Sequence, residues 1–509
     1  MEKRVVVAIA LSLLVLLSWS AFMSKQQPVE TQAVMNADTS APASIAEPVT
    51  VAAPVLPAVR EVPAAELLKF ESADLEVEFV ESQSAIQGIK FKDHLDYNLK
   101  LINGFLLNEP NTVYKKTGKV ADEITFVHSG SGKTISKRFS FSKSKHDIWL
   151  ELKIKNNSSN ELILKEPLIL GVLDFSAKNP HAQYADVMVA TQEKTQHVNA
   201  KKNLDFVNVK FIGLRDRYFC AIIEPQFENV NAFVRKINPT ESEIGLQLPA
   251  TTLAPNQEIV QKFHIYLGPQ SLQPINEVKQ EWAAIMNYGT FDFIAQLLVQ
   301  LLEFIYRMVH NWGVAIIILS ILVYLILYPL TLKQMRSMKE MQILQPKIEA
   351  LRKEYKDNPQ RLNKEIMALY KEHKVNPLGG CLPLLLQMPI FFALYQALMR
   401  SVALRGAKFL WIKDLSEPDK LFLLPFSIPI LGNEFNLLPI LMTIGMFIQQ
   451  KFTTVSASGS SAEQQKIMMI IMPLMFGLIF YRMPSGLVLY WFVNSILMLV
   501  YQLKISKSK

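Results

Sequence analysis

Three polar residues that could do chemistry inside a membrane share one apolar segment of this 509-residue chain. Ser320, Tyr324 and Tyr328 recur at intervals of four residues, so a helix would carry them on one face. A polar group without a partner is costly in hydrocarbon, which makes such residues candidates for function. We predict that they line a weakly polar, hydratable groove for polar parts of another chain. The alternative is that they hydrogen-bond between helices and only hold the bundle together.

Other apolar segments contribute candidates to the same groove. Gln387 lies in the middle of one segment, and Tyr490, Trp491 and Asn494 lie close together in the last one. Tyr490 and Asn494 are four residues apart and therefore share a helix face. If these faces converge with the serine and tyrosine stripe, the groove is lined on several sides. For Gln387 and Asn494, simple interhelical hydrogen bonding is an equally good interpretation.

The sequence lacks the patterns of common enzymes. We find no nucleophile or paired-carboxylate motif, no phosphate-binding Gly-x-x-x-x-Gly-Lys-[Ser/Thr] loop, and no histidine spacing typical of a metal site. Cys220 and Cys381 fall in different regions, so they imply neither a disulfide framework nor a metal site. We therefore predict no catalytic residue, no metal and no cofactor.

The elements that would position these residues are membrane spans. Half of the residues are hydrophobic, and they concentrate after residue 290, whereas residues 24–290 have the composition of a soluble region. A helical span needs roughly 20 apolar residues, and shorter spans thin the bilayer locally. We predict six spans in an α-helical membrane protein: an N-terminal anchor at 1–23, for which a signal peptide is the alternative, and five core spans within 310–503. The core spans are expected at about 313–332, 381–399, 437–450, 467–481 and 487–502.

Basic residues set the predicted orientation, because positive loops stay in the cytoplasm. Eleven Lys or Arg and six Asp or Glu lie between the first two core spans. Apolar residues at three- and four-residue steps predict two amphipathic helices there, a cytoplasmic hairpin at 335–375 with Pro346 kinking or starting the first helix. The simpler alternative is a solvated connector. The basic tail at 504–509 and the N-terminus are predicted to be cytoplasmic too. The candidate binding residues of the hairpin are Lys347, Arg352, Lys353, Arg361 and Lys364.

The region before the core is predicted to lie outside the cytoplasm. Residues 24–62 are rich in Ala, Pro, Val, Thr and Glu and indicate a flexible linker. Residues 63–270 alternate apolar and polar residues between turn signals, which is typical of an all-β sandwich domain. Residues 401–436 are expected outside again, and they contain an apolar piece broken by prolines at 422–435. Strands are expected at 75–80, 147–155, 161–170, 206–214 and 260–268.

Residues 271–309 should connect the two regions. A linking helix is expected at 272–288, followed by an amphipathic helix with charged and amide residues on one face. Such a helix suits the surface of the outer leaflet. The alternative is a helix that packs on the β-domain. The apolar face comprises Ile294, Leu297, Leu298, Leu301, Ile305 and Met308.

Several motifs together resemble one family. They are NWGVAIIILS, YPLTLKQMRSM, LQPKI, KVNPLGGCLPLLLQMPIFFALY, LWIKDLS and MPSGLVLYWFVN, with GLRDRYF and YLGP in the β-domain. The chain resembles the Gram-negative type of the YidC family of membrane protein insertases, strongly over about 280–502 and moderately in the β-domain. The resemblance implies a periplasmic β-supersandwich, an interfacial helix, a cytoplasmic helical hairpin and a five-helix core with a groove open to cytoplasm and lipid.

The resemblance also implies a function. Family members insert, fold and help assemble inner-membrane proteins, alone or with the Sec translocon, often from ribosomes. The expected partners are nascent membrane proteins, the Sec translocon, the ribosome and the lipid bilayer, with no specific nucleic acid. Relatives usually carry a groove Arg where this chain has Tyr324, so a fixed positive charge is missing. Ser320 resembles a position where relatives carry a groove hydroxyl, and Trp491 resembles a client-contacting aromatic residue. The alternatives are a solute transporter or channel, and an anchored periplasmic carbohydrate-binding protein.

Overall fold

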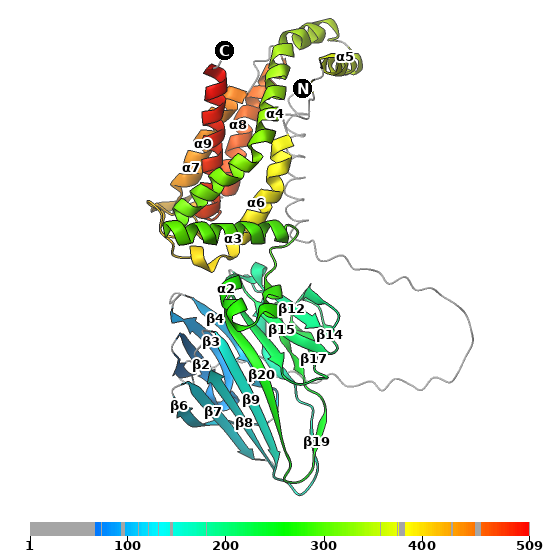
Figure 1. Cartoon of the computed structure of the whole chain (residues 1–509), viewed down its shortest axis with the longest axis vertical. Coiled ribbons are helices and arrows are strands. Elements are labelled where there is room, and N and C mark those ends of the chain that lie inside the picture. Colours follow the sequence, from blue (N-terminus) through cyan, green and yellow to red (C-terminus); the bar gives the residue numbers. More distant parts are fainter. Residues whose placement is uncertain are drawn as a thin grey trace, which may run out of the picture.

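The structure, a computed structural model, describes residues 67–507 except 73, 93–96, 110, 121, 131, 143–145, 180, 357, 374, 376–381, 429–430 and 454–459. The predicted anchor at 1–23, the linker at 24–62 and Cys381 therefore lie outside the described residues. Figure 1 shows the described chain as a strand-rich part, the β-domain, below a bundle of helices.

The β-domain is built from antiparallel sheets. One has the order β1-β2-β3-β4, with β1 Leu67–Glu71, β2 Leu75–Val80, β3 Ala85–Phe91 and β4 Asn98–Gly104. A second has the order β14-β17-β18-β11-β5, with β5 Leu106–Leu107, β11 Leu168–Asp174, β14 Leu204–Phe206, β17 Asn231–Asn238 and β18 Glu241–Gln247. The short strands β10 Leu162–Leu164 and β19 Thr251–Leu253 pair with each other.

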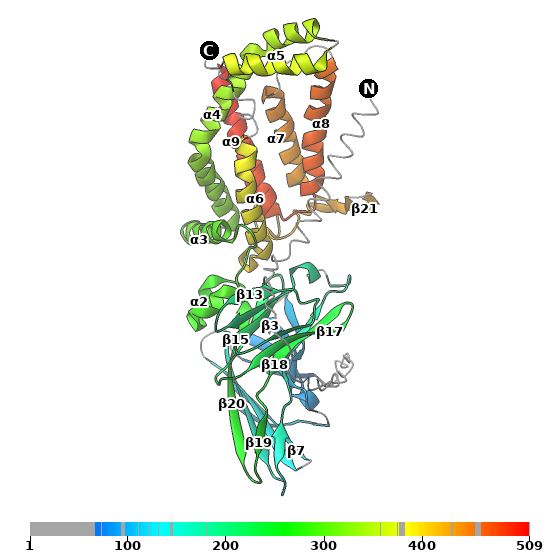
Figure 2. The same cartoon turned by 90° about the vertical axis from the view of Figure 1, so that its right-hand side faces the viewer.

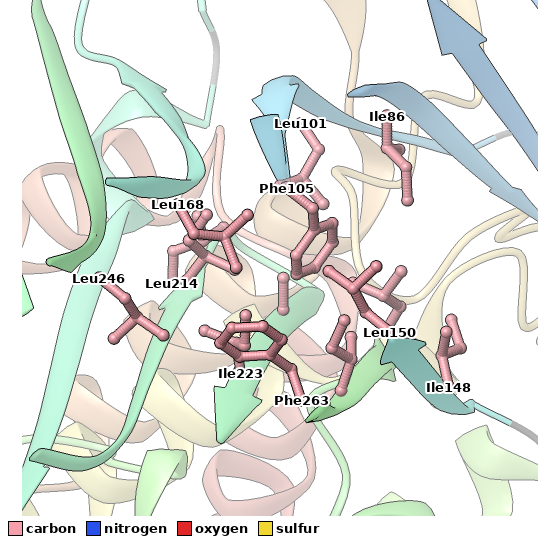
Figure 3. Packing of buried hydrophobic residues seen from close by; sticks show 14 of the residues in the cluster. Ile86, Leu101, Phe105, Ile148, Leu150, Leu168, Leu214, Ile223, Leu246 and Phe263 are labelled. Carbon is pink, nitrogen blue, oxygen red and sulfur yellow. The ribbon is translucent and has the colours of Figure 1, made fainter. Parts of the chain in front are cut away.

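The largest sheet has the order β13-β12-β15-β16-β20-β9-β8-β7-β6. Its strands are β6 Lys115–Val120, β7 Glu123–Gly130, β8 Lys133–Phe141, β9 Asp147–Asn156, β12 Asp186–Thr191, β13 Thr195–Val198, β15 Val209–Arg215, β16 Phe219–Pro225 and β20 Glu258–Pro269. The three larger sheets send apolar side chains into one core, where Ile86, Phe105, Leu150, Leu246 and Phe263 face one another (Figure 3). Residues along β9 alternate between buried and more exposed positions, which explains why the apolar and polar residues alternate in its sequence and predict a strand.

Two predicted strands are each divided. The segment 161–170 forms β10 and β11, because Pro167 lies between them and cannot donate to a sheet ladder. The segment 206–214 begins at the end of β14 and continues as β15 after Asn208, whose φ of +51° turns the chain. The predicted strands at 75–80, 147–155 and 260–268 match β2, β9 and β20.

The connection to the bundle is less helical than predicted. Instead of one helix over 272–288, the structure has α2 Leu272–Val278 and a 3-10 turn, η5 Gln280–Ile285. The amphipathic helix is α3 Asp292–Val309, and it packs against α4 Trp312–Glu354 and α6 Leu382–Arg400. Figure 1 shows α3 lying across the lower end of the bundle, between the other helices and the β-domain.

The remaining elements complete the bundle. They are α5 Pro359–Glu372, the hairpin strands β21 Phe422–Ile428 and β22 Gly432–Phe435, and the helices α7 Leu437–Thr453, α8 Ser460–Phe480 and α9 Ser485–Lys507. Helix α9 lies between α4 and α7 and packs against both (Figure 2). Among the described residues, Trp312–Lys333 and Ser485–Leu503 are long and apolar enough to cross a membrane. Leu437–Gln450 and Ile470–Phe480 are shorter apolar helices.

Helix α4 combines two predicted elements. The first core span and the first arm of the cytoplasmic hairpin form one continuous helix of 43 residues. Its start is capped by Asn311, whose Oδ1 accepts a hydrogen bond of 3.0 Å from the Val314 amide. Pro346 does not start a new helix, since both Pro329 and Pro346 lie inside α4. The apolar stripe and the charged stripe therefore share one rigid element.

Candidate functional site

Helices α6 and α9 bring three of the predicted groove residues together. Gln387 Nε2 donates to Tyr490 Oη at 2.8 Å, and Asn494 Nδ2 donates to the Tyr490 carbonyl oxygen at 2.9 Å. The Tyr490 side chain is fully buried, whereas Gln387 and Asn494 are partly exposed. This network ties α6 to α9 and keeps polar atoms inside the bundle.

The three stripe residues on α4, Ser320, Tyr324 and Tyr328, have different surroundings. Ser320 is fully buried, and its hydroxyl donates to the Ile316 carbonyl oxygen at 2.7 Å, so its own helix satisfies it. Tyr324 is different, because its hydroxyl is buried and has no hydrogen-bond partner among the described residues. The Tyr328 ring lies 6.3 Å from the Tyr324 ring and meets Tyr501 of α9 edge-on at 5.4 Å.

An unsatisfied buried hydroxyl calls for an explanation, since nearly all buried polar groups have a partner. The Tyr324 hydroxyl can both donate and accept a hydrogen bond. Its surroundings are the aromatic rings of Tyr328 and Tyr501 rather than a charged partner. The arrangement suits the binding of water or a polar group from another chain.

Trp491 belongs to another group of residues. Its ring centroid lies 5.3 Å from that of Phe391, 5.9 Å from that of Phe476 and 5.3 Å from that of Phe480. These rings come from α6, α8 and α9, and Trp491 is partly exposed. The predicted groove residues of α9 thus divide between the polar network of Tyr490 and Asn494 and the aromatic group around Trp491.

The helical hairpin formed by the end of α4 and by α5 has a small core of its own. Leu344, Ile348 and Val375 are buried, and Lys347 Nζ lies 3.0 Å from His373 Nε2. Helix α5 starts after Asn358, whose Oδ1 accepts from the Arg361 amide at 3.0 Å. The Arg361 guanidinium lies 5.1 Å from the Tyr355 ring centroid. Of the predicted basic residues, Arg352 is partly buried, and the exposed ones are Lys347, Lys353, Arg361 and Lys364.

Helix α3 uses its apolar residues differently from the prediction. Leu298 and Ile305, assigned to the lipid-facing side, are buried against protein, and Ile294 and Leu301 are partly buried. The physical reason is that α3 packs on α4 and α6, which occupy its most apolar face. Leu297 and Met308 of the predicted face are exposed, and with Phe293 and Phe304 they form an exposed apolar stripe. On the polar side, Arg307 Nη2 donates to Gln273 Oε1 of α2 at 3.2 Å.

Sequence reasoning missed a polar joint between the β-domain and the bundle. Arg217, in the turn between β15 and β16, donates to the Met399 carbonyl oxygen, to Glu417 Oε1 and to the Ser416 carbonyl oxygen, each at 2.9 Å. The Arg405 guanidinium lies 4.7 Å from the Tyr97 ring centroid. The only signal was the GLRDRYF motif, because the partners are about 180 to 200 residues away in sequence.

Within the described part of the chain, no group of three or more His, Cys, Asp or Glu residues could hold an ion. The candidate site is a set of uncharged polar and aromatic side chains on α4, α6 and α9.

Comparisons with known proteins identify the family. A family model described as "60Kd inner membrane protein" matches residues 304–509, and one described as "YidC periplasmic domain" matches residues 99–301. A membrane protein insertase YidC of Pelobacter propionicus is 32% identical over 550 residues, covering 100% of this chain and 99% of the relative. One of Syntrophobacter fumaroxidans is 37% identical over 422 residues, covering 80% of this chain and 75% of the relative.

Among solved structures, an active YidC insertase with its first transmembrane domain resolved matches at 20% identity and a TM-score of 0.41, covering 86% of this chain and 93% of that one. The family assignment rests on the sequence matches, which extend through both the β-domain and the bundle. This chain belongs to the YidC family of membrane protein insertases, with a β-rich periplasmic domain and a helical insertase core.

Proposed function

We propose that this insertase receives the polar end of a client segment beside Tyr324, while the apolar side of the client lies along the third and fifth predicted spans, α6 and α8. The observation that carries the proposal is the buried Tyr324 hydroxyl, which has no hydrogen-bond partner within the described part of the chain. A polar client group hydrogen-bonded there would avoid the several kcal/mol that an unpaired group costs in hydrocarbon. The Gln387–Tyr490–Asn494 network offers further polar atoms in the same bundle.

The release of the client into lipid needs no nucleotide. Burial of apolar client surface contributes roughly 25 cal/mol per Å², which favours movement of an apolar segment out of a hydratable site into the bilayer. Short apolar helices at 437–450 and 470–480 would thin the membrane locally and lower the barrier for the polar end.

The proposed topology has six spans, with both termini and the α4–α5 hairpin in the cytoplasm. The exposed basic residues Lys353, Arg361 and Lys364 support this side, because positive segments are retained in the cytoplasm. The same residues would suit contacts with ribosomal RNA or anionic lipid. The Sec translocon is a second proposed partner, carried over from the family resemblance.

Site-specific photocrosslinking tests the groove. A photoreactive residue at 320, 324, 387 or 491 is introduced while a single-span client is being synthesised on ribosomes. We expect crosslinks to the nascent span from 324 and 387. The matched control is Ile326 on the same helix, which is 70% exposed and should crosslink to lipid. Equal client crosslinking from 324 and 326, or none from 324 in folded protein, would refute the groove.

A further inference from the structure

The hairpin of β21 and β22 has an unusual surface for a segment in water. Leu421, Phe422, Leu423 and Phe426 are all exposed, the last two by 66% and 60%. Residues 421–433, LFLLPFSIPILGN, contain no charged side chain. An isolated two-stranded hairpin is at best marginally stable in water. Exposed apolar residues on both faces of such a ribbon indicate an apolar environment.

The base of the hairpin is held firmly by polar contacts. Lys420 Nζ pairs with Glu434 Oε1 at 3.2 Å across the base. Asn436 Nδ2 donates to the Tyr481 carbonyl oxygen at 2.7 Å, and Tyr481 Oη donates to the Glu434 carbonyl oxygen at 2.9 Å. The hairpin is thus fixed to the end of α8, and its apolar part projects from a rigid mount.

The position of the hairpin places it at the periplasmic surface of the membrane. Helix α7 begins at Leu437 directly after β22, and α8 ends at Phe480 beside the hairpin base. Figure 2 shows β21 pointing away from the bundle at about the level of α3, on the opposite side. Exposed apolar residues continue from the hairpin onto the faces of α7 and α8, at Ile444, Ile448, Leu474 and Leu478.

We propose that the β21–β22 hairpin inserts into the outer leaflet of the membrane as a lipid anchor. Together with the exposed stripe of α3, it would hold the bundle at a defined depth from two opposite sides. The occupant is lipid because α7 and α8, which flank the hairpin base, also expose apolar residues, as membrane helices do toward lipid. Lys420 and Arg482 are exposed beside its base, where lipid phosphates would meet them.

The expected depth follows from backbone hydrogen bonding. A two-stranded ribbon leaves peptide groups unpaired at both edges, and these are costly in the hydrocarbon core. Pro425 has no N–H group and so reduces that cost within β21. The hairpin should therefore lie at the boundary between headgroups and acyl chains, as interfacial helices do. This inference does not depend on the proposed groove.

A single fluorescent label measures the depth. Leu423→Cys is made in full-length protein carrying Cys381→Ser, labelled with an NBD dye, and reconstituted into vesicles of phosphatidylethanolamine and phosphatidylglycerol. The native Cys220 is buried, and burial raises the pKa of its thiol, so it should not react. Ile163→Cys is the matched water control, because Ile163 is 61% exposed on the β-domain. Leu297→Cys on α3 is the interfacial reference.

We expect label 423 to behave like label 297. Its emission should shift to the blue, doxyl groups near the headgroups should quench it more than doxyl groups at the chain ends, and iodide should quench it several-fold less than label 163. Quenching by iodide equal to that of label 163 would overturn the anchor. Protection that appears only at high protein-to-lipid ratio, without doxyl quenching, would assign the surface to a second copy and also overturn it.

Discussion

At the scale of single residues, Tyr324 stands where the family resemblance predicts a positively charged groove residue. Ser320, Tyr324 and Tyr328 all carry a hydroxyl group. Of these three, Tyr324 is the one whose hydroxyl is buried without a hydrogen-bond partner among the described residues. If the proposed groove receives clients at Tyr324, its donor there is uncharged, and attraction of acidic client segments should be weak.

A positive charge at this position should restore that attraction. Tyr324→Arg is expected to be tolerated and to improve insertion of clients with acidic tails by about fivefold, since an exposed charge pair is worth about 1 kcal/mol. The measurement is protease protection of the client in proteoliposomes. Leu325→Arg, which places the charge on an exposed neighbour, should not help. An equal gain for clients with neutral tails would show that charge capture is not the cause.

A buried carboxyl group in the periplasmic domain predicts a dependence of stability on pH. Glu243 on β18 is only 5% exposed, and burial raises the pKa of its side chain to about 7. In the unfolded chain, the pKa of Glu243 would lie near its ordinary value. The stabilisation is therefore fully present below that ordinary value and is lost as the pH rises through the folded pKa of about 7.

Glu243→Gln should remove this dependence. We expect little change in the midpoint of thermal unfolding at pH 4.5 and a higher midpoint at pH 8, with a gain in unfolding free energy of at most about 3 kcal/mol. Scanning calorimetry of the detergent-solubilised protein at both pH values is the measurement. The exposed Glu228→Gln is the control. A higher midpoint at pH 4.5 as well would mean that Glu243 is not the titrating group.

At the scale of elements, short helices of the core pack through small residues. Gly477 of α8 faces Thr443 of α7 so closely that a Cβ atom on the glycine would lie 2.3 Å from Thr443 Oγ1. The threonine cannot simply move, because its hydroxyl donates to the Pro439 carbonyl oxygen at 2.7 Å. Glycine at this contact therefore determines the separation of α7 and α8.

Gly477→Val should push these helices apart. We expect a loss of roughly 1–3 kcal/mol in unfolding free energy from overpacking. The measurement is the thermal midpoint in detergent, together with the yield of a disulfide engineered between α7 and α8. Leu478→Val, at the exposed neighbour, is the matched control. Equal stability of the two variants would contradict the close contact.

At the scale of the whole molecule, the periplasmic domain is locked onto the membrane core. Arg217 is 7% exposed and donates to three acceptors in the segment that includes the end of α6 and the loop after it. Arg400 adds a hydrogen bond of 2.9 Å to the Asn287 carbonyl oxygen in the link before α3. These contacts oppose free rotation of the domain.

Removal of this joint should loosen the two parts without unfolding either. Arg217→Ala is expected to cost roughly 2–4 kcal/mol at the joint, because buried acceptors lose a charged donor. Limited proteolysis should then cut residues 271–291 faster while the β-domain stays resistant. The exposed Lys210→Ala on β15 should leave cleavage unchanged. Unchanged cleavage in Arg217→Ala would show that other contacts hold the domains.

The transporter and carbohydrate-binding alternatives are set aside by the family assignment, which covers both regions of the chain. The count of six spans stays a prediction, since the described residues contain two helices of clear membrane length and two shorter apolar ones. The short helices carry fewer apolar residues than a straight span requires, so their role depends on the local thickness of the bilayer.

The sequence by itself determined the local elements and the family. Alternation predicted β2, β9 and β20, helical spacing predicted α3 and α5, and contiguous motifs identified an insertase, because these signals depend on residues close together in the chain. The sequence predicted only that the helix faces with Gln387 and Tyr490 could meet, because residues close together in the chain do not show which helix faces are in contact.

Tertiary structure alone decided which partner each side chain received. Ser320 bonds to its own helix, whereas the Tyr324 hydroxyl has no hydrogen-bond partner among the described residues. Helix α3 buries its most apolar face against protein. Arg217 binds Glu417, which is 200 residues away in the sequence. The physical reason is that the residues on one face show only whether that face needs a polar or an apolar partner. Which surface meets that need depends on how α4, α6 and α9 and the sheets pack in space.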